Sequence, residues 1–228
     1  MILEVCAFNI QSCLIAERSG AARIELCADP LQGGTTPSYG TILYALEQLF
    51  IPIFPMIRPR GGNFIYDKDE LEIMKKDIQQ CRSFGCPGIA TGIQLRDGSI
   101  DTERLKRIVD WAYPMAVTCH KVFDTTPDAF QALEDVIDAG CSRILTSGLS
   151  KSATEGADLI AKLISQAAGR IIIMPGGGVR SSNIEQLIKD TGANEYHSSC
   201  LVSKANDQVA DEEEVRLVAE LLMKQERE

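Results

Sequence analysis

The stretch Ile171-Ile172-Ile173-Met174-Pro175-Gly176-Gly177-Gly178-Val179 joins a short apolar run to three glycines, and a helical pattern begins near Ser181. A short apolar run without polar alternation is typical of a strand in a parallel sheet, which is buried on both faces. The same order, a β-rich run and then a longer segment with apolar residues at helical spacing, continues in both directions along the chain. Residues 171–179 therefore belong to one unit of a repeated βα series.

Eight runs of this kind predict an α/β protein with eight strands, the number that lets a parallel sheet close into a TIM (β/α)8 barrel. The length of 228 residues suits one such barrel, so residues 1–228 are predicted to form a single domain. A doubly wound open sheet is the main alternative, and the lack of a GxGxxG motif after the first run argues against it. The predicted strands are Leu3–Phe8, Arg23–Ala28, Pro52–Ile57, Gly88–Leu95, Met115–Val122, Arg143–Ser147, Ile171–Pro175 and Ala193–Ser198.

Local signals predict where some helices begin. Thr36-Pro37 and Thr126-Pro127 each place a hydroxyl before a proline, a pattern typical of a capping residue followed by the first helical position. Near the end of the chain, the acidic residues 211–214 precede an apolar stripe that includes Val215 and Leu222. These residues predict an extra C-terminal helix packed on the wall of the barrel.

Composition excludes several classes of function. The net charge of −9 and the pI near 4.9 leave no excess of lysine and arginine for binding nucleic acid or an anionic membrane. No apolar run approaches the length of a membrane span, and the first residues lack the basic segment of a signal peptide. The eight cysteines are predicted to be reduced thiols of a cytoplasmic protein whose partners are small molecules or metal ions. No motif for an organic cofactor is evident.

Alternation along the predicted strands places charged residues inside the barrel. The outer side of each strand lies under apolar helix faces, so a charged residue within a strand is predicted to point inward or to lie at the rim. Glu4 and Glu25 are assigned to the interior on this ground, either as functional groups or as parts of a structural network with Arg58 or Lys121. The pairs that share an inward face are Glu4 with Cys6, Glu25 with Cys27, Thr118 with His120, and Glu195 with His197.

Polar residues at the carboxyl ends of the strands converge on one rim. Arg58 ends the third strand, the segment His120–Asp124 follows the fifth, and Thr146-Ser147-Gly148 ends the sixth. The chain has two histidines, and both, His120 and His197, fall at strand exits on the inward face. Barrel enzymes keep their active sites at this rim, so the sequence predicts a polar pocket there.

The glycine run after the seventh strand predicts an anion site. Gly176-Gly177-Gly178 exposes backbone N–H groups beside the start of a helix, and Ser198 at the end of the eighth strand can add a hydroxyl. The loops after strands seven and eight form the usual phosphate site of this fold. The alternative is a tight turn without a ligand. As a ligand site, this loop together with Ser147 and Gly148 would suit a phosphorylated substrate.

Six segments spread over nearly the whole chain carry a pattern beyond the barrel repeat: Arg23–Cys27, Gly33–Ser38, Met56–Gly62, Ile144–Gly148, Met174–Gly178 and His197–Ser199. Together they resemble the CutC copper homeostasis family. The resemblance implies a cytoplasmic barrel, usually a homo-oligomer, that is proposed to bind Cu(I). One departure is Lys121, where the family has arginine, so an ammonium group replaces a planar guanidinium.

The resemblance also implies copper ligands at Cys6 and Cys27. Thiolates are soft ligands suited to Cu(I), and neighbouring strands lie about 4.8 Å apart, close enough for two inward sulfur atoms to share one ion. The alternative is that stagger between adjacent strands separates the two thiols and leaves them as core residues.

Two functions follow. The first is a copper homeostasis protein that binds Cu(I) through the two cysteines. The second is an enzyme of the isomerase, lyase or hydrolase type that acts on a small phosphorylated metabolite at the rim. A structural or partner-binding barrel without catalysis is a third alternative. The catalytic set predicted for the enzyme is His120 and His197 as acid and base, Glu25 to orient one of them, Arg58 to stabilise negative charge, and Asp124.

Overall fold

Parallel strands and α-helices alternate along the chain, eight of each, in the computed structural model, which describes residues 1–201 and 208–225. All eight predicted strands are present, and most of them end one to four residues before their predicted ends, where the chain turns into the loops of the rim. The strands are β1 (Ile2–Ala7), β2 (Arg23–Leu26), β3 (Ile53–Pro55), β4 (Gly88–Thr91), β5 (Ala116–Cys119), β6 (Arg143–Thr146), β7 (Ile172–Pro175) and β8 (Glu195–Ser198). The helices are α1 (Ile10–Arg18), α2 (Tyr39–Gln48), α3 (Lys68–Ser83), α4 (Thr102–Ala112), α5 (Ala129–Asp138), α6 (Ala157–Ala167), α7 (Ile184–Thr191) and α8 (Glu212–Gln225), with short 3-10 helices η1 (Pro30–Gln32) and η2 (Lys121–Thr125).

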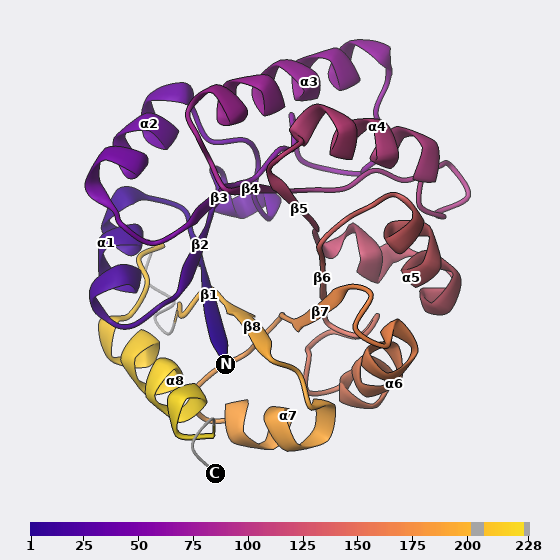
Figure 1. Cartoon of the computed structure of the whole chain (residues 1–228). Coiled ribbons are helices and arrows are strands. Elements are labelled where there is room, and N and C mark those ends of the chain that lie inside the picture. The colour runs from indigo at the N-terminus through magenta and orange to yellow at the C-terminus, as the bar shows by residue number, and fades with distance from the viewer. Residues whose placement is uncertain (202–207, 226–228) are drawn as a thin grey trace.

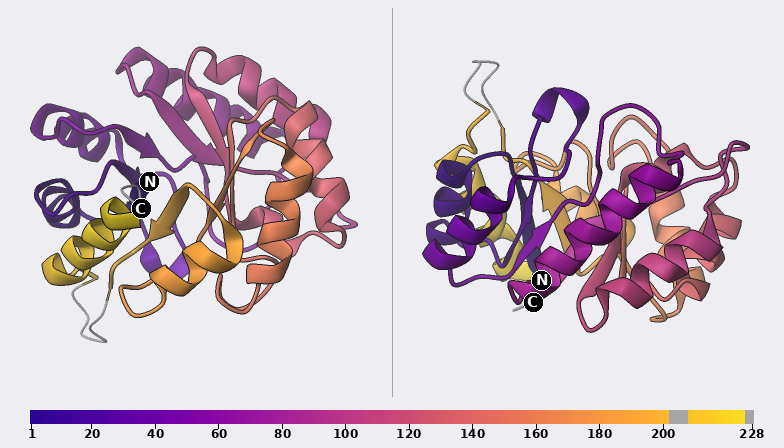
Figure 2. Two further views of the ribbon diagram at one scale, coloured as in Figure 1. Left: turned by 60° about the horizontal axis from the view of Figure 1, so that its bottom comes forward. Right: turned by 90° about the horizontal axis from the view of Figure 1, so that it is seen from above.

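The strands form a closed ring made of two four-stranded arcs. One arc has the strand order β3-β2-β1-β8, and the other has the order β4-β5-β6-β7. The arcs meet at two seams, where Met56 pairs with Ala90 and Gly176 pairs with His197. The helices form an outer layer around this ring (Figure 1, Figure 2), so the predicted (β/α)8 fold is confirmed.

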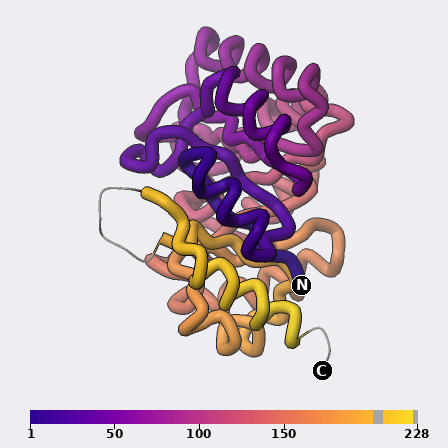
Figure 3. Tube along the Cα trace, turned by 90° about the vertical axis from the view of Figure 1, so that its left-hand side faces the viewer, coloured from indigo at the N-terminus to yellow at the C-terminus, as the bar shows by residue number. Residues whose placement is uncertain are grey.

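Helix α8 closes the helical layer beside the first segments of the chain. It follows β8 and packs against α1, α7 and β1 (Figure 3). The helix predicted as an extra element is therefore present, and it is the helix of the eighth βα unit. Its first turn also holds the loop after β7, because Glu214 accepts hydrogen bonds from the backbone N–H and the hydroxyl of Ser181, each 2.7 Å long.

The two faces of the strands differ in chemistry, as alternation predicts. In β2, Ile24 and Leu26 belong to the apolar core, whereas Arg23 points into the ring and contacts Glu195 of the non-adjacent strand β8. Within the described residues, no helix has both the length and the apolar character that crossing a membrane requires.

Two predicted helix starts are wrong by two residues. Helix α2 begins after Ser38, whose hydroxyl accepts from the Thr41 backbone N–H, and α5 begins after Asp128. The two threonines form other hydrogen bonds instead. Thr36 accepts a hydrogen bond from the backbone N–H of Arg58 (2.9 Å), and Thr126 donates to the carbonyl of Phe123, three residues earlier (2.8 Å). Thr36 therefore joins two loops of the rim, whereas Thr126 closes the turn η2 in which Phe123 lies.

Candidate metal and anion site at the barrel mouth

A buried ion network fills the inside of the ring at the amino-terminal half of the strands. Arg23 donates to Glu4 and to Glu195, with 2.6 Å between its Nη2 and Glu195 Oε2. Arg143 donates through Nε to the same oxygen over 2.6 Å, and both guanidinium groups lie over the Phe54 ring. The sequence assigned Glu4 a partner in Arg58 or Lys121, and the structure pairs it with Arg23. Neither arginine of the network is singled out by the sequence, although strand alternation places both on inward faces.

His197 joins this network to the mouth of the barrel. Its Nδ1 lies 2.7 Å from Glu4 Oε1, and its Nε2 lies 3.9 Å from Glu25 Oε2. Burial opposes ionisation of Glu4, but the hydrogen bond from His197 and the charge of Arg23 lower the pKa of Glu4 to about 2. Burial would also lower the pKa of His197, yet Glu25, Cys6 and Glu4 around the ring raise it well above its ordinary value. Glu4 therefore fixes the orientation of His197 through a charge-assisted hydrogen bond.

Cys6 and Cys27 meet above this histidine. Their Sγ atoms lie 3.9 Å apart, and Cys27 Sγ lies 3.5 Å from Glu25 Oε2. The hydrogen bond with Cys27 and the neighbouring His197 outweigh burial and lower the pKa of the Cys6 thiol to about 5, whereas the pKa of Cys27 is raised. Burial and the nearby Cys6 sulfur raise the pKa of Glu25 well above its ordinary value. Stagger between β1 and β2 does not separate the two thiols, although Cys6 pairs in register with Glu25, two residues before Cys27.

Two overlapping groups of potential metal ligands result. Cys6, Glu25 and Cys27 form one group, and Glu4, Glu25 and His197 form the other, with the ligand atoms of each group within 4.8 Å of one another. A third sulfur lies beside the first group, since Met56 packs in the same small buried cluster as the two cysteines. The sequence does not single out Met56. Met56 lies at the end of β3, as Cys6 and Cys27 lie at the ends of β1 and β2. This shared position is the signal that could have identified it.

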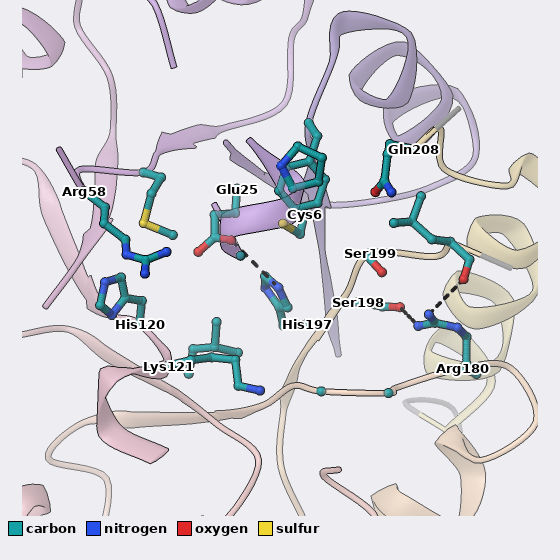
Figure 4. Close-up of a pocket in the computed structure, with 18 of the residues that line it drawn as sticks. Cys6, Glu25, Arg58, His120, Lys121, Arg180, His197, Ser198, Ser199 and Gln208 are labelled. Carbon is teal, nitrogen blue, oxygen red and sulfur yellow. Dashed lines mark hydrogen bonds and ion pairs between the residues drawn. The ribbon is translucent and has the colours of Figure 1, made fainter. Parts of the chain in front are cut away.

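A cavity of about 280 Å³ opens above these groups at the carboxyl ends of the strands (Figure 4). It brings together most of the predicted site residues and adds one cation that the sequence does not single out, Arg180 of the loop after β7. The predicted residues that line it are Cys6, Glu25, Arg58, His120, Gly177, Gly178, His197 and Ser198, together with Lys121. Cys27, Asp124, Ser147, Gly148 and Gly176 do not line it.

His120 is a buried, neutral imidazole at the wall of this cavity. Its Nδ1 accepts a hydrogen bond from the backbone N–H of Val122 over 3.2 Å, which places the proton of the ring on Nε2. Burial and the positive charge of Arg58 lower the pKa of His120 to about 3. The ring therefore offers a hydrogen-bond donor to the cavity at neutral pH.

Arg58 uses most of its donors to organise the loops of the rim. Its Nη1 donates to the carbonyls of Gln32 (2.6 Å) and Gly34 (2.8 Å), and its Nη2 donates to the carbonyl of Gly62 (2.8 Å). The guanidinium also lies 4.7 Å from the centre of the Phe64 ring. Its Nε is buried and has no hydrogen-bond partner among the described residues, so the Nε–H is available to a ligand.

The glycine loop and Arg180 form the opposite wall. Within the described residues, the backbone N–H groups of Gly177 and Gly178 have no hydrogen-bond acceptor. Arg180 donates to the Ser198 hydroxyl (3.1 Å) and to the carbonyl of Leu201 (3.0 Å), and Ser198 in turn donates to the carbonyl of Val179 (2.7 Å). The proton of the Ser198 hydroxyl is therefore already used, while Gly177, Gly178 and Arg180 line the cavity.

Asp124 stabilises the loop after β6. Its carboxylate accepts hydrogen bonds from the hydroxyl of Thr146, from the backbone N–H and hydroxyl of Ser147, and from the backbone N–H of Leu149. Gly148 packs closely against Gly156, where a side chain would meet the backbone. These residues stabilise the loop without lining the cavity. Lys121 does line the cavity, and its Nζ lies 3.8 Å from Asp124 Oδ2.

Comparison with known proteins shows the family of the chain. The model of the CutC family matches residues 1–202. A family protein CutC from Chromobacterium violaceum is 48% identical over 198 residues, which cover 87% of this chain and 80% of that protein. A human protein named copper homeostasis protein cutC homolog is 44% identical over 198 residues, which cover 87% of this chain and 72% of the human protein.

Solved structures show the same barrel. The crystal structure of a CutC protein from Streptococcus agalactiae is 33% identical in sequence, with a TM-score of 0.83 over 87% of this chain and 98% of that chain. Phosphoribosylanthranilate isomerase from Thermotoga maritima is similar with a TM-score of 0.66 at 13% identity, over 98% of this chain and 100% of that chain, which shows a shared fold alone. Because the family model matches residues 1–202, the chain belongs to the CutC family.

Proposed function

We propose that this protein acts in copper homeostasis by binding Cu(I) between Cys6 and Cys27 in the cytoplasm. The observation that carries the proposal is the separation of 3.9 Å between the two sulfur atoms. Two metal–thiolate bonds of about 2.3 Å, the length found with zinc, reach across this distance without any shift of the strands. One ion therefore fits between the two thiols.

The chemistry of the neighbouring groups supports a soft cation. Cu(I) favours thiolate and thioether ligands, and Met56 packs against both cysteines. The lowered pKa of Cys6 favours its thiolate, the form that binds a metal. Glu25 and His197, which Glu4 orients, line the cavity together with Cys6, so either residue can complete the ligand set once its proton is released.

Titration of the reduced protein with Cu(I) against the chelator bicinchoninate tests this assignment. Wild type is expected to withdraw one equivalent of Cu(I), and the double variant Cys6→Ser, Cys27→Ser is expected to lose that site. The matched control is Cys81→Ser, Cys86→Ser, which removes two other buried thiols and should keep it. If the first variant binds Cu(I) as wild type does, copper binding at this pair is excluded.

A second candidate function is an enzyme that acts on a small phosphorylated compound. The free N–H groups of Gly177 and Gly178, together with Arg180 and Lys121, favour an anion at one wall of the cavity. In this function His197 contacts the reacting part of the substrate as acid or base, and His120 donates a hydrogen bond to the substrate. A ligand that binds the folded state raises its melting temperature, so a series of phosphorylated metabolites and inorganic phosphate should stabilise wild type and not Arg180→Gln. Absence of any stabilisation would exclude this function.

The family resemblance further leads us to propose that the protein self-associates. Size-exclusion chromatography with light scattering at micromolar concentration measures the molar mass directly. A mass equal to one chain of 24.9 kDa would contradict self-association.

A further inference from the structure

Unsatisfied buried polar atoms gather in the cavity. Among the described residues, four buried side-chain atoms have no hydrogen-bond partner, and three of them, Glu25 Oε1, Arg58 Nε and His120 Nε2, belong to residues that line the cavity. Each of these three residues is exposed by 5% or less. Because buried polar groups in proteins are nearly always bonded, such a concentration indicates where a ligand makes hydrogen bonds.

The unbonded nitrogen of His120 is held in place by its surroundings. The Val122 N–H fixes the Nδ1 side of the ring, and Phe64 lies against the ring with 4.8 Å between the ring centres. Gly92 lies close to the same edge as Nδ1, where a Cβ atom would be 2.8 Å from Nδ1. The Nε2–H donor therefore has one orientation, set before any ligand arrives.

Arg58 contributes a buried positive charge without a counter-charge. Within the described residues it forms no ion pair, and its hydrogen bonds go to three backbone carbonyls. A buried guanidinium normally lies beside a carboxylate, since burial without a partner is costly. Phe64 contacts both the guanidinium and the His120 ring, so the two unused donors lie on the same part of the wall (Figure 4).

We propose that His120 and Arg58 form a carboxylate-binding subsite, so that the ligand of this cavity is a small organic acid. One carboxylate oxygen accepts from His120 Nε2–H and the other from Arg58 Nε–H, and the carboxylate supplies the negative charge that Arg58 lacks. His120 acts here as a neutral donor and neither as a base nor as a metal ligand. Its lowered pKa keeps it in this form at neutral pH.

The subsite lies on the opposite side of the cavity from Arg180 and Ser198 (Figure 4). An acid that carries a second anionic group would place that group near Lys121, Arg180 and the free amides of Gly177 and Gly178. The inference thus deepens the second candidate function and rests on it for the position of the ligand, while the carboxylate subsite can be tested without it.

The test uses imidazole ¹⁵N spectra of the full protein, which has two histidines, so one variant assigns both rings. Wild type is titrated with glycolate, 2-phosphoglycolate and inorganic phosphate. We expect His120 to show a protonated Nε2 and an unprotonated Nδ1. Glycolate and 2-phosphoglycolate should shift the Nε2 signal in a saturable manner, and inorganic phosphate should leave it unchanged.

Two substitutions separate binding from folding. His120→Asn can still accept from the Val122 N–H but lacks the inner donor, so its affinity for 2-phosphoglycolate should fall at least about tenfold, as expected for a lost hydrogen bond to a charged group. Its affinity for inorganic phosphate should not change. His120→Gln places an N–H near the position of Nε2 and should retain most of the affinity.

Unshifted His120 signals with both carboxylates, or wild-type affinity in His120→Asn, would overturn the carboxylate subsite. Failure of inorganic phosphate alone to bind would instead remove the phosphate wall of the second candidate function. The two results are distinguishable, because glycolate has no phosphate group.

Discussion

Replacing Glu195 with glutamine should destabilise the fold more than replacing either of its cationic partners. Its carboxylate accepts hydrogen bonds from the guanidinium groups of Arg23 and Arg143, each over 2.6 Å, and its side chain is 7% exposed. Glutamine would leave Arg143 with the Thr118 hydroxyl and the Phe54 ring, and removal of one member of a buried pair costs about 3–5 kcal/mol. In Arg143→Met, by contrast, Glu195 retains Arg23, so the expected cost is about 1–3 kcal/mol.

Equilibrium unfolding in urea, followed by circular dichroism and by the fluorescence of the single tryptophan, Trp111, measures these differences. The double variant Glu195→Gln, Arg143→Met removes both charges, so it should be more stable than the sum of the single changes implies. Glu213→Gln, at an exposed ion pair of α8, is the control and should leave the unfolding midpoint unchanged. A larger loss in Arg143→Met than in Glu195→Gln would refute the idea that Glu195 is the centre of the network.

Three further measurements probe the rim. The unfolded chain binds a proton below pH 6.5 that folded His120, with a pKa near 3, does not bind, so the free energy of unfolding should fall by about 1.4 kcal/mol for each pH unit below 6.5. Urea unfolding at pH 7 and pH 5 should show a larger fall in wild type than in His120→Asn; equal pH dependence would contradict it. Gly92→Ala places a methyl group against His120 and should lower the melting temperature, with a loss of about 1–3 kcal/mol, whereas Gly40→Ala has open space and should not. Glu214→Gln should weaken its two hydrogen bonds with Ser181 by about 1–2 kcal/mol in total, and unchanged urea unfolding would show that this link is not stabilising.

The sequence predicts the barrel and much of the rim because both depend on simple periodicity. Alternation in a strand that is covered by helices assigns Glu4, Glu25 and His197 to the interior without knowledge of their partners. The partners themselves depend on register across the ring, which one sequence does not contain. For this reason the pairing of Glu4 with Arg23 is found only in the structure.

Hydroxyl and carboxylate groups at the strand exits are the least predictable part. Thr36 and Thr126 have the local pattern of helix caps, yet Thr36 bonds to the backbone of Arg58 and Thr126 to the carbonyl of Phe123, three residues earlier. Asp124 follows β5 like a catalytic residue, but it accepts hydrogen bonds from the loop after β6. In each case another contact, within the turn or with a neighbouring loop, competes with the predicted role, and local sequence does not reveal which contact is stronger.

The division of the ring into two arcs has a consequence for its breathing motions. At one seam, the Ile57 N–H donates to Ala90 (2.8 Å) beside the isolated pairing of Met56, whereas β1 and β2 pair over four consecutive residues from Glu4 onward. Local opening is easier where fewer hydrogen bonds must break together, so the Ile57 amide should exchange with deuterium faster than the amides between β1 and β2. Arg58 follows one arc and His120 follows the other, so an acid held by both would bridge the seam and slow that exchange.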